Sequence, residues 1–99
     1  MPPKVSLDPS RISEFCRRWK VAELSLFGSV LRDDFRPDSD VDVLVEFKSG
    51  ARIEFIDLED MAAELAAMFG RPVDVVTKKW LKPRVRDEVL GSSMVVYAA

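Results

Sequence analysis

The stretch Leu26-Phe-Gly-Ser-Val-Leu-Arg-Asp-Asp-Phe-Arg-Pro-Asp-Ser-Asp-Val-Asp-Val-Leu-Val45 contains the features that decide the fold. Both of its ends read as strands, and alternation of apolar and polar side chains is clearest in the second. Its middle is polar and contains Pro37-Asp38, which is typical of a turn-rich connection. We therefore expect one strand over residues 22–28 and a second over residues 40–47.

The rest of the chain supplies the elements that surround these strands. Asp8-Pro9-Ser10 is typical of a helix start, since a capping residue precedes proline in the first turn. An apolar stripe predicts a second helix over residues 55–69, which Gly70 and Pro72 end. The other predicted elements are a strand at 73–77, a helix at 83–90 and a strand at 94–97. This order predicts a mixed α/β (α+β) domain, with a small sheet of about four strands flanked by helices.

The composition limits what kind of protein this is. With 99 residues, the chain is expected to form a single domain over residues 1–99. The net charge of −2 argues against a nucleic-acid partner held by a basic surface. Cys16 is the only cysteine, which excludes an internal disulfide and fits a reducing cytoplasm. We expect no signal peptide, because the first residues lack its apolar stretch, and no apolar run approaches the roughly 18 residues that span a membrane.

Histidine is absent from the sequence. This absence excludes serine–histidine and cysteine–histidine catalysis, histidine general bases and histidine-ligated zinc. Catalysis would therefore depend on carboxylates, hydroxyls, lysine or arginine, the backbone and a bound metal. Hard oxygen ligands favour Mg²⁺, with Mn²⁺ as the alternative.

Asp40 and Asp42 are candidate metal ligands. Alternate residues of a strand point the same way, and their backbones lie roughly 6.5–7 Å apart. A divalent cation between two such carboxylates relieves their repulsion. Asp74, in Val73-Asp74-Val75, can bring a third carboxylate from a neighbouring strand. Three carboxylates can hold two metal ions about 3.5–4 Å apart, as in-line phosphoryl displacement requires.

Gly28-Ser29, at the end of the first predicted strand, is a candidate phosphate site. Glycine allows a phosphate to approach the backbone closely. The Ser29 hydroxyl and the backbone N–H groups of the following turn can donate to phosphate oxygens. Arg32, one turn later, can neutralise the charge of a triphosphate.

Simpler explanations exist for each feature taken alone. An Asp-x-Asp pair also occurs on ordinary half-solvated strands, and Gly-Ser pairs are common in turns. The acidic side of residues 54–64 is interpreted as a solvated helix face, and Cys16 as a core residue. The basic stretch at residues 78–86 is interpreted as a solvated loop and helix, although contact with phosphates stays open. The combination of a Gly-Ser turn, Asp-x-Asp and a later strand carrying Asp74 favours phosphate and metal chemistry.

Gly28-Ser29, ten residues and then Asp40-x-Asp42 resemble the signature of the DNA polymerase β-like nucleotidyltransferase superfamily. The longer string, from Phe27 through Pro37 to Val45, is similar to the minimal nucleotidyltransferases, which often serve as antitoxins of HEPN–MNT toxin–antitoxin pairs. The resemblance extends over nearly the whole chain. Val30 departs from it, because many relatives carry arginine at that position.

The resemblance implies a role for each matching residue. Gly28 and Ser29, with Arg32, would hold the triphosphate of ATP. Asp40 and Asp42 would bind both magnesium ions. Asp74 would bind one of them and help to deprotonate the acceptor hydroxyl. The implied activity is transfer of AMP from ATP to a hydroxyl of a HEPN toxin, typically a tyrosine.

Two other functions stay open at this point. The chain could neutralise a toxin by contact alone, or it could transfer AMP to RNA or a small molecule. A nucleotide site, a metal site and a core nearly exhaust 99 residues. We therefore expect the acceptor to belong to a partner protein, in a hetero-oligomer.

Overall fold

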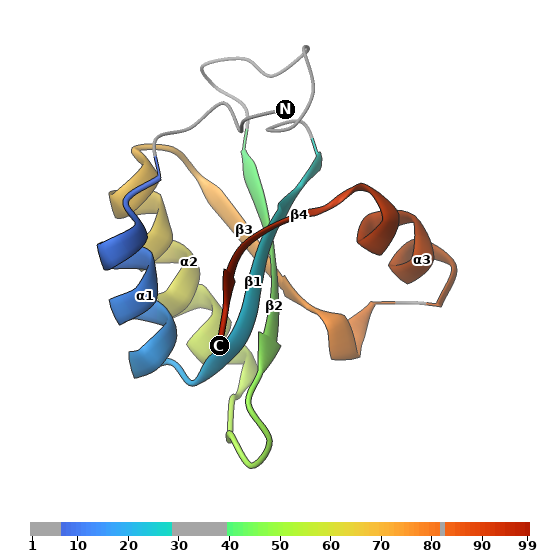
Figure 1. Cartoon of the computed structure of the whole chain (residues 1–99), viewed down its shortest axis with the longest axis horizontal. Helices are drawn as coiled ribbons and strands as arrows, with labels where there is room; N and C mark the ends of the chain where they lie inside the picture. The colour runs from blue at the N-terminus through green and yellow to red at the C-terminus, as the bar shows by residue number, and fades with distance from the viewer. Residues whose placement is uncertain (1–6, 29–39, 82) are drawn as a thin grey trace.

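The computed structural model describes residues 7–28, 40–81 and 83–99. These residues form a four-stranded mixed sheet with flanking helices (Figure 1), which confirms the predicted fold class. The strand order is β3-β2-β1-β4, in which β2 and β3 are parallel and the other neighbours are antiparallel. The elements are α1 (Pro9–Arg18), β1 (Val21–Phe27), β2 (Val41–Phe47), α2 (Phe55–Phe69), β3 (Val73–Thr77), the 3-10 turn η2 (Lys78–Trp80), α3 (Pro83–Ser92) and β4 (Met94–Ala98).

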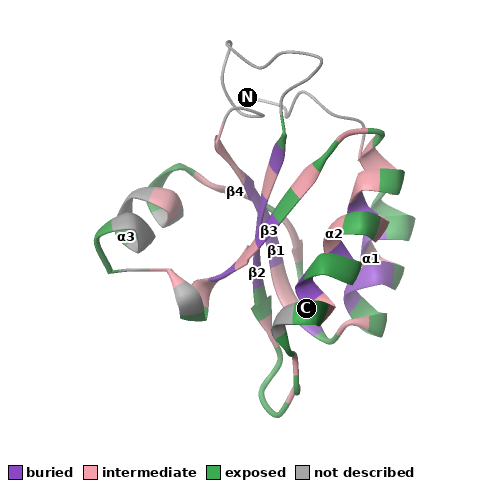
Figure 2. Cartoon of the chain, turned by 180° about the vertical axis from the view of Figure 1, so that it is seen from behind, coloured by how far each residue is buried: buried purple, intermediate pink, exposed green. Residues whose placement is uncertain are grey.

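Helices α1 and α2 lie side by side on one face of the sheet, and α3 lies on the other side (Figure 1). The core fills the space between these two helices and the sheet, where the purple buried residues gather in Figure 2. Val41, Val43 and Val45 of β2 all point into it and are fully buried. Cys16 is buried in the same core, as predicted, and Trp19 packs against its edge. Alternation along β2 therefore assigns one face of the strand to this core, while the other face carries Asp42 and Glu46 on either side of the buried Leu44.

The helix ends follow from local chemistry. The Asp8 side chain accepts hydrogen bonds from the backbone N–H groups of Ser10 and Arg11, as its position before Pro9 predicts. Glu54 and Asp57 form a reciprocal capping box at the start of α2. Gly70 ends α2 in the left-handed conformation, at φ 70°. These short-range signals are the reason that the bounds of α2 and β3 match their predicted bounds.

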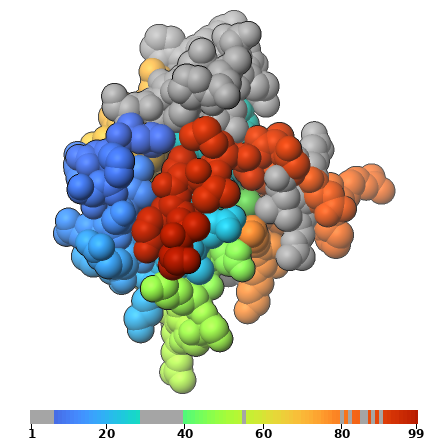
Figure 3. Space-filling view, viewed as in Figure 1, coloured from blue at the N-terminus to red at the C-terminus, as the bar shows by residue number. Residues whose placement is uncertain are grey.

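The bounds of other elements differ from the predicted ones. The α3 helix continues to Ser92, two residues beyond its predicted end, and the 3-10 turn η2 was not predicted. The β4 strand extends to Ala98, and the Ala99 N–H donates to the Ala22 carbonyl at 2.8 Å. In Figure 3, β4 lies on the molecular surface against α1. In the part of the chain that the structure describes, every helix is too short or too polar to cross a membrane.

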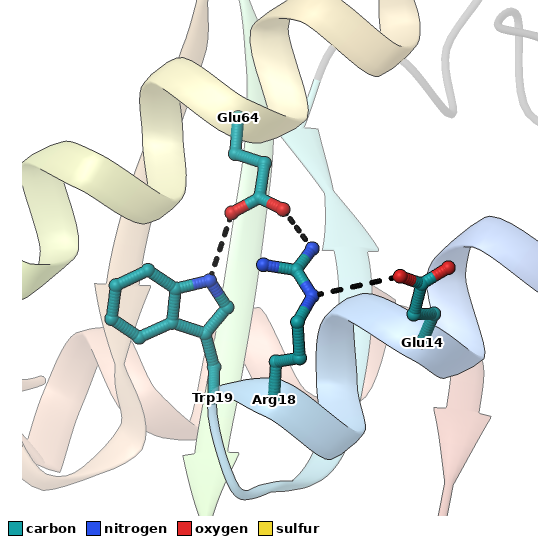
Figure 4. Close-up of polar contacts among 4 residues, drawn as sticks. All are labelled: Glu14, Arg18, Trp19 and Glu64. Atoms are coloured by element: carbon teal, nitrogen blue, oxygen red, sulfur yellow. Dashed lines mark hydrogen bonds and ion pairs between the residues drawn. The ribbon is translucent and has the colours of Figure 1, made fainter.

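Glu64 joins the two helices that cover the core (Figure 4). Its carboxylate accepts a hydrogen bond from Trp19 Nε1 at 2.9 Å and a second from the Arg18 guanidinium, which also pairs with Glu14. The hydrogen bond from Arg18 holds the pKa of Glu64 below its ordinary value. The prediction of a merely solvated acidic helix face is therefore wrong for Glu64, since this residue binds α2 to the end of α1.

Candidate active site

Three strand ends meet at one end of the sheet (Figure 1). Because β1 runs antiparallel to β2, and β3 parallel to it, the end of β1 lies beside the starts of β2 and β3. Within this row Phe27 is paired with Asp42, and Asp42 with Asp74. Paired residues of neighbouring strands point to the same face, and neighbouring strands lie about 4.8 Å apart. The register therefore places the Asp42 and Asp74 carboxylates next to each other, on the face opposite to the core.

Asp40 directly precedes β2 and is exposed, as is Asp74, whereas Asp42 is half-buried. Two of the three predicted carboxylates are thus paired by the sheet, and the third stands at the entrance to the same strand. Within residues 7–28, 40–81 and 83–99, no set of three or more carboxylate or thiol side chains is already grouped around a single point.

Gly28 lies directly against the Asp42 carboxylate. Its φ of 78° is in the left-handed region, which glycine adopts at little cost. A Cβ atom added at Gly28 would lie only 2.2 Å from Oδ2 of Asp42. Glycine is therefore required here both by the backbone conformation and by the space that the carboxylate occupies. The turn that was predicted to approach a phosphate also contacts a predicted metal ligand.

Ser29, Val30 and Arg32 lie outside the described residues, and their predicted roles stay predictions. The donor set that is described fits a hard divalent cation, because Asp40, Asp42 and Asp74 offer only carboxylate oxygens. These three residues would hold Mg²⁺, and the backbone at Gly28 would lie beside it.

Lys78, which directly follows β3, lies at the other end of the sheet face that carries Asp42 and Asp74. Its ammonium group donates to Oε2 of Glu46 at 2.8 Å and lies 3.5 Å from Oε1 of Glu23. The hydrogen bond with Glu46 raises the pKa of Lys78. The interpretation of residues 78–86 as a solvated basic stretch is therefore wrong for Lys78. The offset of 32 positions that pairs Asp42 with Asp74 also pairs Glu46 with Lys78, so a correct strand register would have revealed the contact.

Cys16 has no place in this site. It lies in the core, and burial raises the pKa of its thiol to about 12. A thiol with so high a pKa is almost entirely protonated at neutral pH, which makes it a poor nucleophile.

A mixed four-stranded sheet that pairs two aspartates beside a glycine turn defines the class of the polymerase β-like nucleotidyltransferases. The family follows from comparison with known proteins. The sequence model of the nucleotidyltransferase domain family matches residues 10–96 of this chain. The chain therefore belongs to this family. It is accordingly a nucleotidyltransferase.

Individual relatives agree with this assignment. The chain is 40% identical over 85 residues to the protein adenylyltransferase MntA of Thermococcus cleftensis, covering 85% of this chain and 81% of that protein. It is 32% identical to a proposed minimal nucleotidyltransferase of known structure, with a TM-score of 0.71 and coverage of 87% and 86%.

Two solved toxin–antitoxin complexes share the fold at lower identity. One, with AMP-PNP, has a TM-score of 0.77 at 21% identity and covers 94% of this chain and 75% of that one. The other is a tri-AMPylated HEPN toxin of Shewanella oneidensis in complex with its MNT antitoxin, with a TM-score of 0.68 at 19% identity and coverage of 92% and 70%.

Proposed function

We propose that this chain transfers AMP from ATP to a tyrosine hydroxyl of a partner HEPN toxin, with Mg²⁺, and thereby acts as its antitoxin. The in-register pairing of Asp42 with Asp74, beside Gly28, is the observation that carries this proposal. Carboxylates held this close on adjacent strands are suited to bind metal ions for phosphoryl transfer. The similarity to a protein adenylyltransferase supports a protein acceptor.

The reaction exchanges one phosphorus–oxygen bond for another. The acceptor oxygen attacks the α-phosphorus of ATP and forms a new P–O bond. The bond between the α-phosphorus and the oxygen that bridges to the β-phosphorus breaks, and pyrophosphate leaves with its electron pair. The hydroxyl proton passes to the Asp74 carboxylate and then to water. The products are an AMP ester of the partner, pyrophosphate and one proton.

Each residue contributes position or charge. Asp40 and Asp42 hold the metal site, and Asp74 lies on the outer side of Asp42, where an acceptor can approach from the edge of the sheet. The backbone after Gly28, with Ser29 and Arg32, holds the triphosphate. Mg²⁺ held by Asp40 and Asp42 would supply positive charge against the charge that develops on the phosphate oxygens. Most of the rate enhancement then comes from positioning and charge neutralisation.

The partner supplies the acceptor, so the working form is a hetero-oligomer. Two solved relatives are toxin–antitoxin complexes, one holding an AMPylated HEPN toxin and the other AMP-PNP. We place the reaction in the cytoplasm, where the free Cys16 thiol stays reduced.

Labelled ATP tests the proposal directly. The protein is mixed with α-³²P-ATP, Mg²⁺ and a candidate HEPN toxin, sought first as the product of the neighbouring gene. We expect label on that protein, lost in Asp42→Asn. Glu46→Gln is the matched control, because it removes one carboxylate from the same face of the same strand, away from the site. A tight complex without label would show neutralisation by contact alone, and label on added RNA alone would show a different acceptor. Either outcome would overturn the proposal.

A further inference from the structure

A cavity of about 560 Å³ lies at the end of the sheet where β2 continues past the end of β3. Strand β3 pairs with β2 only up to the pair of Val45 and Thr77, whereas β2 continues to Phe47. The loop from β2 to α2 lies at this end of the sheet (Figure 1), and its residues Ala51 and Ile53 line the cavity together with the ends of both strands. The fold therefore forms a recess between this loop and the start of η2.

This cavity is separate from the proposed active site. Val45 and Thr77 are paired, so their side chains point to the same face of the sheet, and Val45 is buried in the core. The carboxylates of Asp42 and Asp74 point to the opposite face. Three positions along β3, or about 10 Å, also separate Asp74 from Thr77. A molecule in the cavity would therefore not occupy the carboxylate site.

Three lysines line the cavity, Lys48, Lys78 and Lys79, against a single carboxylate among its described lining residues, that of Glu46. Lys78 donates to Glu46 at 2.8 Å, so these two charges compensate each other. Lys48 and Lys79 are exposed, and within the described part of the chain neither forms an ion pair. The cavity thus has an excess of positive charge, in a chain whose net charge is −2.

A neighbouring cavity at the same edge of the sheet has the opposite character. It lies between α2 and β3, has a volume of about 400 Å³, and its described charged lining residues are Glu59 and Asp74. Of these two cavities, the one beside the loop suits an anion, because like charges would repel an anion from the other.

Thr77 provides an independent indication that a ligand binds here. The residue lines the cavity and is only 6% exposed, and among the described residues its Oγ1 atom has no hydrogen-bond partner. A buried hydroxyl without a partner costs free energy, and such atoms are rare in folded proteins. Because Thr77 borders both cavities, the lysines decide from which side an acceptor oxygen reaches it.

We propose that the cavity beside the loop binds a small organic anion, in which a carboxylate is attached to an apolar body. Thr77 and Lys79 are two positions apart at the end of β3, and a carboxylate has one oxygen for each of them. The apolar body packs against Phe47 and Ile53, as is common in ligand sites of this size. The exposed Lys48 adds positive charge from the other strand. The proposed function neither requires nor excludes this site.

Binding of benzoate tests the site without ATP, Mg²⁺ or a partner protein. We expect benzoate to shift the methyl NMR signals of Val45, Ala51 and Ile53, with an affinity in the millimolar range. Benzamide keeps the ring but has no charge, and acetate keeps the charge but has no ring, so both should bind at least fivefold more weakly. Unchanged spectra at tens of millimolar benzoate, or equal binding of benzamide, would overturn the proposal.

Lys79→Gln tests the contribution of charge. We expect this variant to bind benzoate about fivefold more weakly, because a contact between opposite charges becomes a neutral one. Arg17→Gln is the matched control, since it removes one exposed cation from α1, and Arg17 does not line the cavity. Its affinity for benzoate should stay within twofold of the wild type. An unchanged affinity in Lys79→Gln, or equal losses in the two variants, would overturn the proposed anion site.

Ala51→Leu tests the position of the ligand. The larger side chain occupies the cavity and should abolish the benzoate shifts. Ser49→Leu adds the same side chain to the same loop, at an exposed residue that does not line the cavity, and should retain binding. Circular dichroism shows that both variants are folded. Full binding of benzoate by folded Ala51→Leu would place the ligand elsewhere and overturn the proposal.

Thr77 separates a role in binding from a structural role. Thr77→Val removes the unpartnered hydroxyl at constant shape, so the free protein should melt at a temperature equal to or above that of the wild type, while benzoate binding falls severalfold. Thr77→Ser keeps the hydroxyl and should retain binding within twofold. An unchanged affinity of Thr77→Val for benzoate would overturn the proposed hydrogen bond between Thr77 and the carboxylate.

Discussion

The two faces of β2 differ within seven residues: one carries only apolar side chains, whereas the other carries Asp42 and Glu46 with Leu44 between them. Val41, Val43 and Val45 are fully buried against α1 and α2. Between them Asp42 points to the other face, where it pairs with Asp74 and touches Gly28. Because Asp42 alternates with the three valines along one strand, packing of the valines in the core fixes the position of its carboxylate without touching it. Stability and chemistry should therefore respond separately to mutation.

The open face itself has two different ends. At one end Lys78 lies between Glu46 and Glu23 and compensates their charges. At the other end two aspartates are paired directly, although like charges in opposed positions destabilise a sheet. The first end resembles ordinary surface structure, whereas the second carries the carboxylates of the proposed metal site. In the proposed function, a cation would join these two carboxylates.

The largest effect is expected from Asp42→Asn. Loss of one metal-binding carboxylate should lower the rate of AMP transfer about a thousandfold, which corresponds to ~4 kcal/mol. The variant should remain folded, with a urea midpoint close to that of the wild type, because Asn keeps the shape of the side chain. Initial rates of label transfer and urea unfolding measure the two quantities. A rate within tenfold of the wild type would remove Asp42 from the site.

Leu65→Ala should have the converse effect: it should lower stability and leave the rate of AMP transfer almost unchanged. Leu65 is fully buried in the core beneath the sheet. Its truncation should cost about 3 kcal/mol of unfolding free energy, from lost burial and the cavity left behind. Transfer per folded molecule should stay within twofold. Ala67→Ser, exposed on the same helix, should cost about 0.5 kcal/mol or less. A specific loss of activity in folded Leu65→Ala would contradict the separation of the two faces.

Gly28→Ala should lower both the stability of the fold and the rate of AMP transfer, each to an intermediate degree. A left-handed conformation costs a non-glycine residue about 1–2 kcal/mol, and the new Cβ would displace the Asp42 carboxylate. We expect transfer to fall at least tenfold. Gly50→Ala is the control, since Gly50 has a similar φ of 85° but no atom lies within 4 Å of the added Cβ. It should lose similar stability and retain transfer. Equal transfer by the two variants would show that Gly28 serves the backbone alone.

The smallest effect is expected from Glu64→Gln, which removes the charged partner of Arg18 between α1 and α2. This effect depends on pH. The hydrogen bond from Arg18 lowers the pKa of Glu64 in the folded protein. The stabilisation is therefore complete above the unfolded pKa of about 4.3, and it is lost as pH falls through the lower folded pKa. The wild-type protein should exceed Glu64→Gln in urea midpoint at pH 7, and the difference should shrink towards pH 3. A difference that is constant between pH 7 and pH 3 would show that the charge of Glu64 contributes nothing.

Local signals in the sequence predicted much of the fold. Asp8 before Pro9 and Gly70 after α2 marked helix ends through contacts within a few residues. The alternation over residues 41–47 predicted which side chains of β2 enter the core. For the site, Gly28, Asp40, Asp42 and Asp74 could be proposed because each residue type has a distinct chemistry in its place. Lys78 and Glu64 were misread as solvated residues, since their partners lie 32 to 55 residues away.

By itself, the sequence determined the order of the helices and strands, the core face of β2 and, since no histidine is present, the exclusion of histidine chemistry. These properties depend on residue type and on neighbours within one or two turns. Only the tertiary structure decided that β3 lies parallel to β2 with Asp74 opposite Asp42, that Gly28 closes on the same carboxylate, and that a cavity opens between α2 and β3. Strand order and register depend on packing the whole core at once, because residues far apart in the chain must satisfy the same apolar contacts and backbone hydrogen bonds.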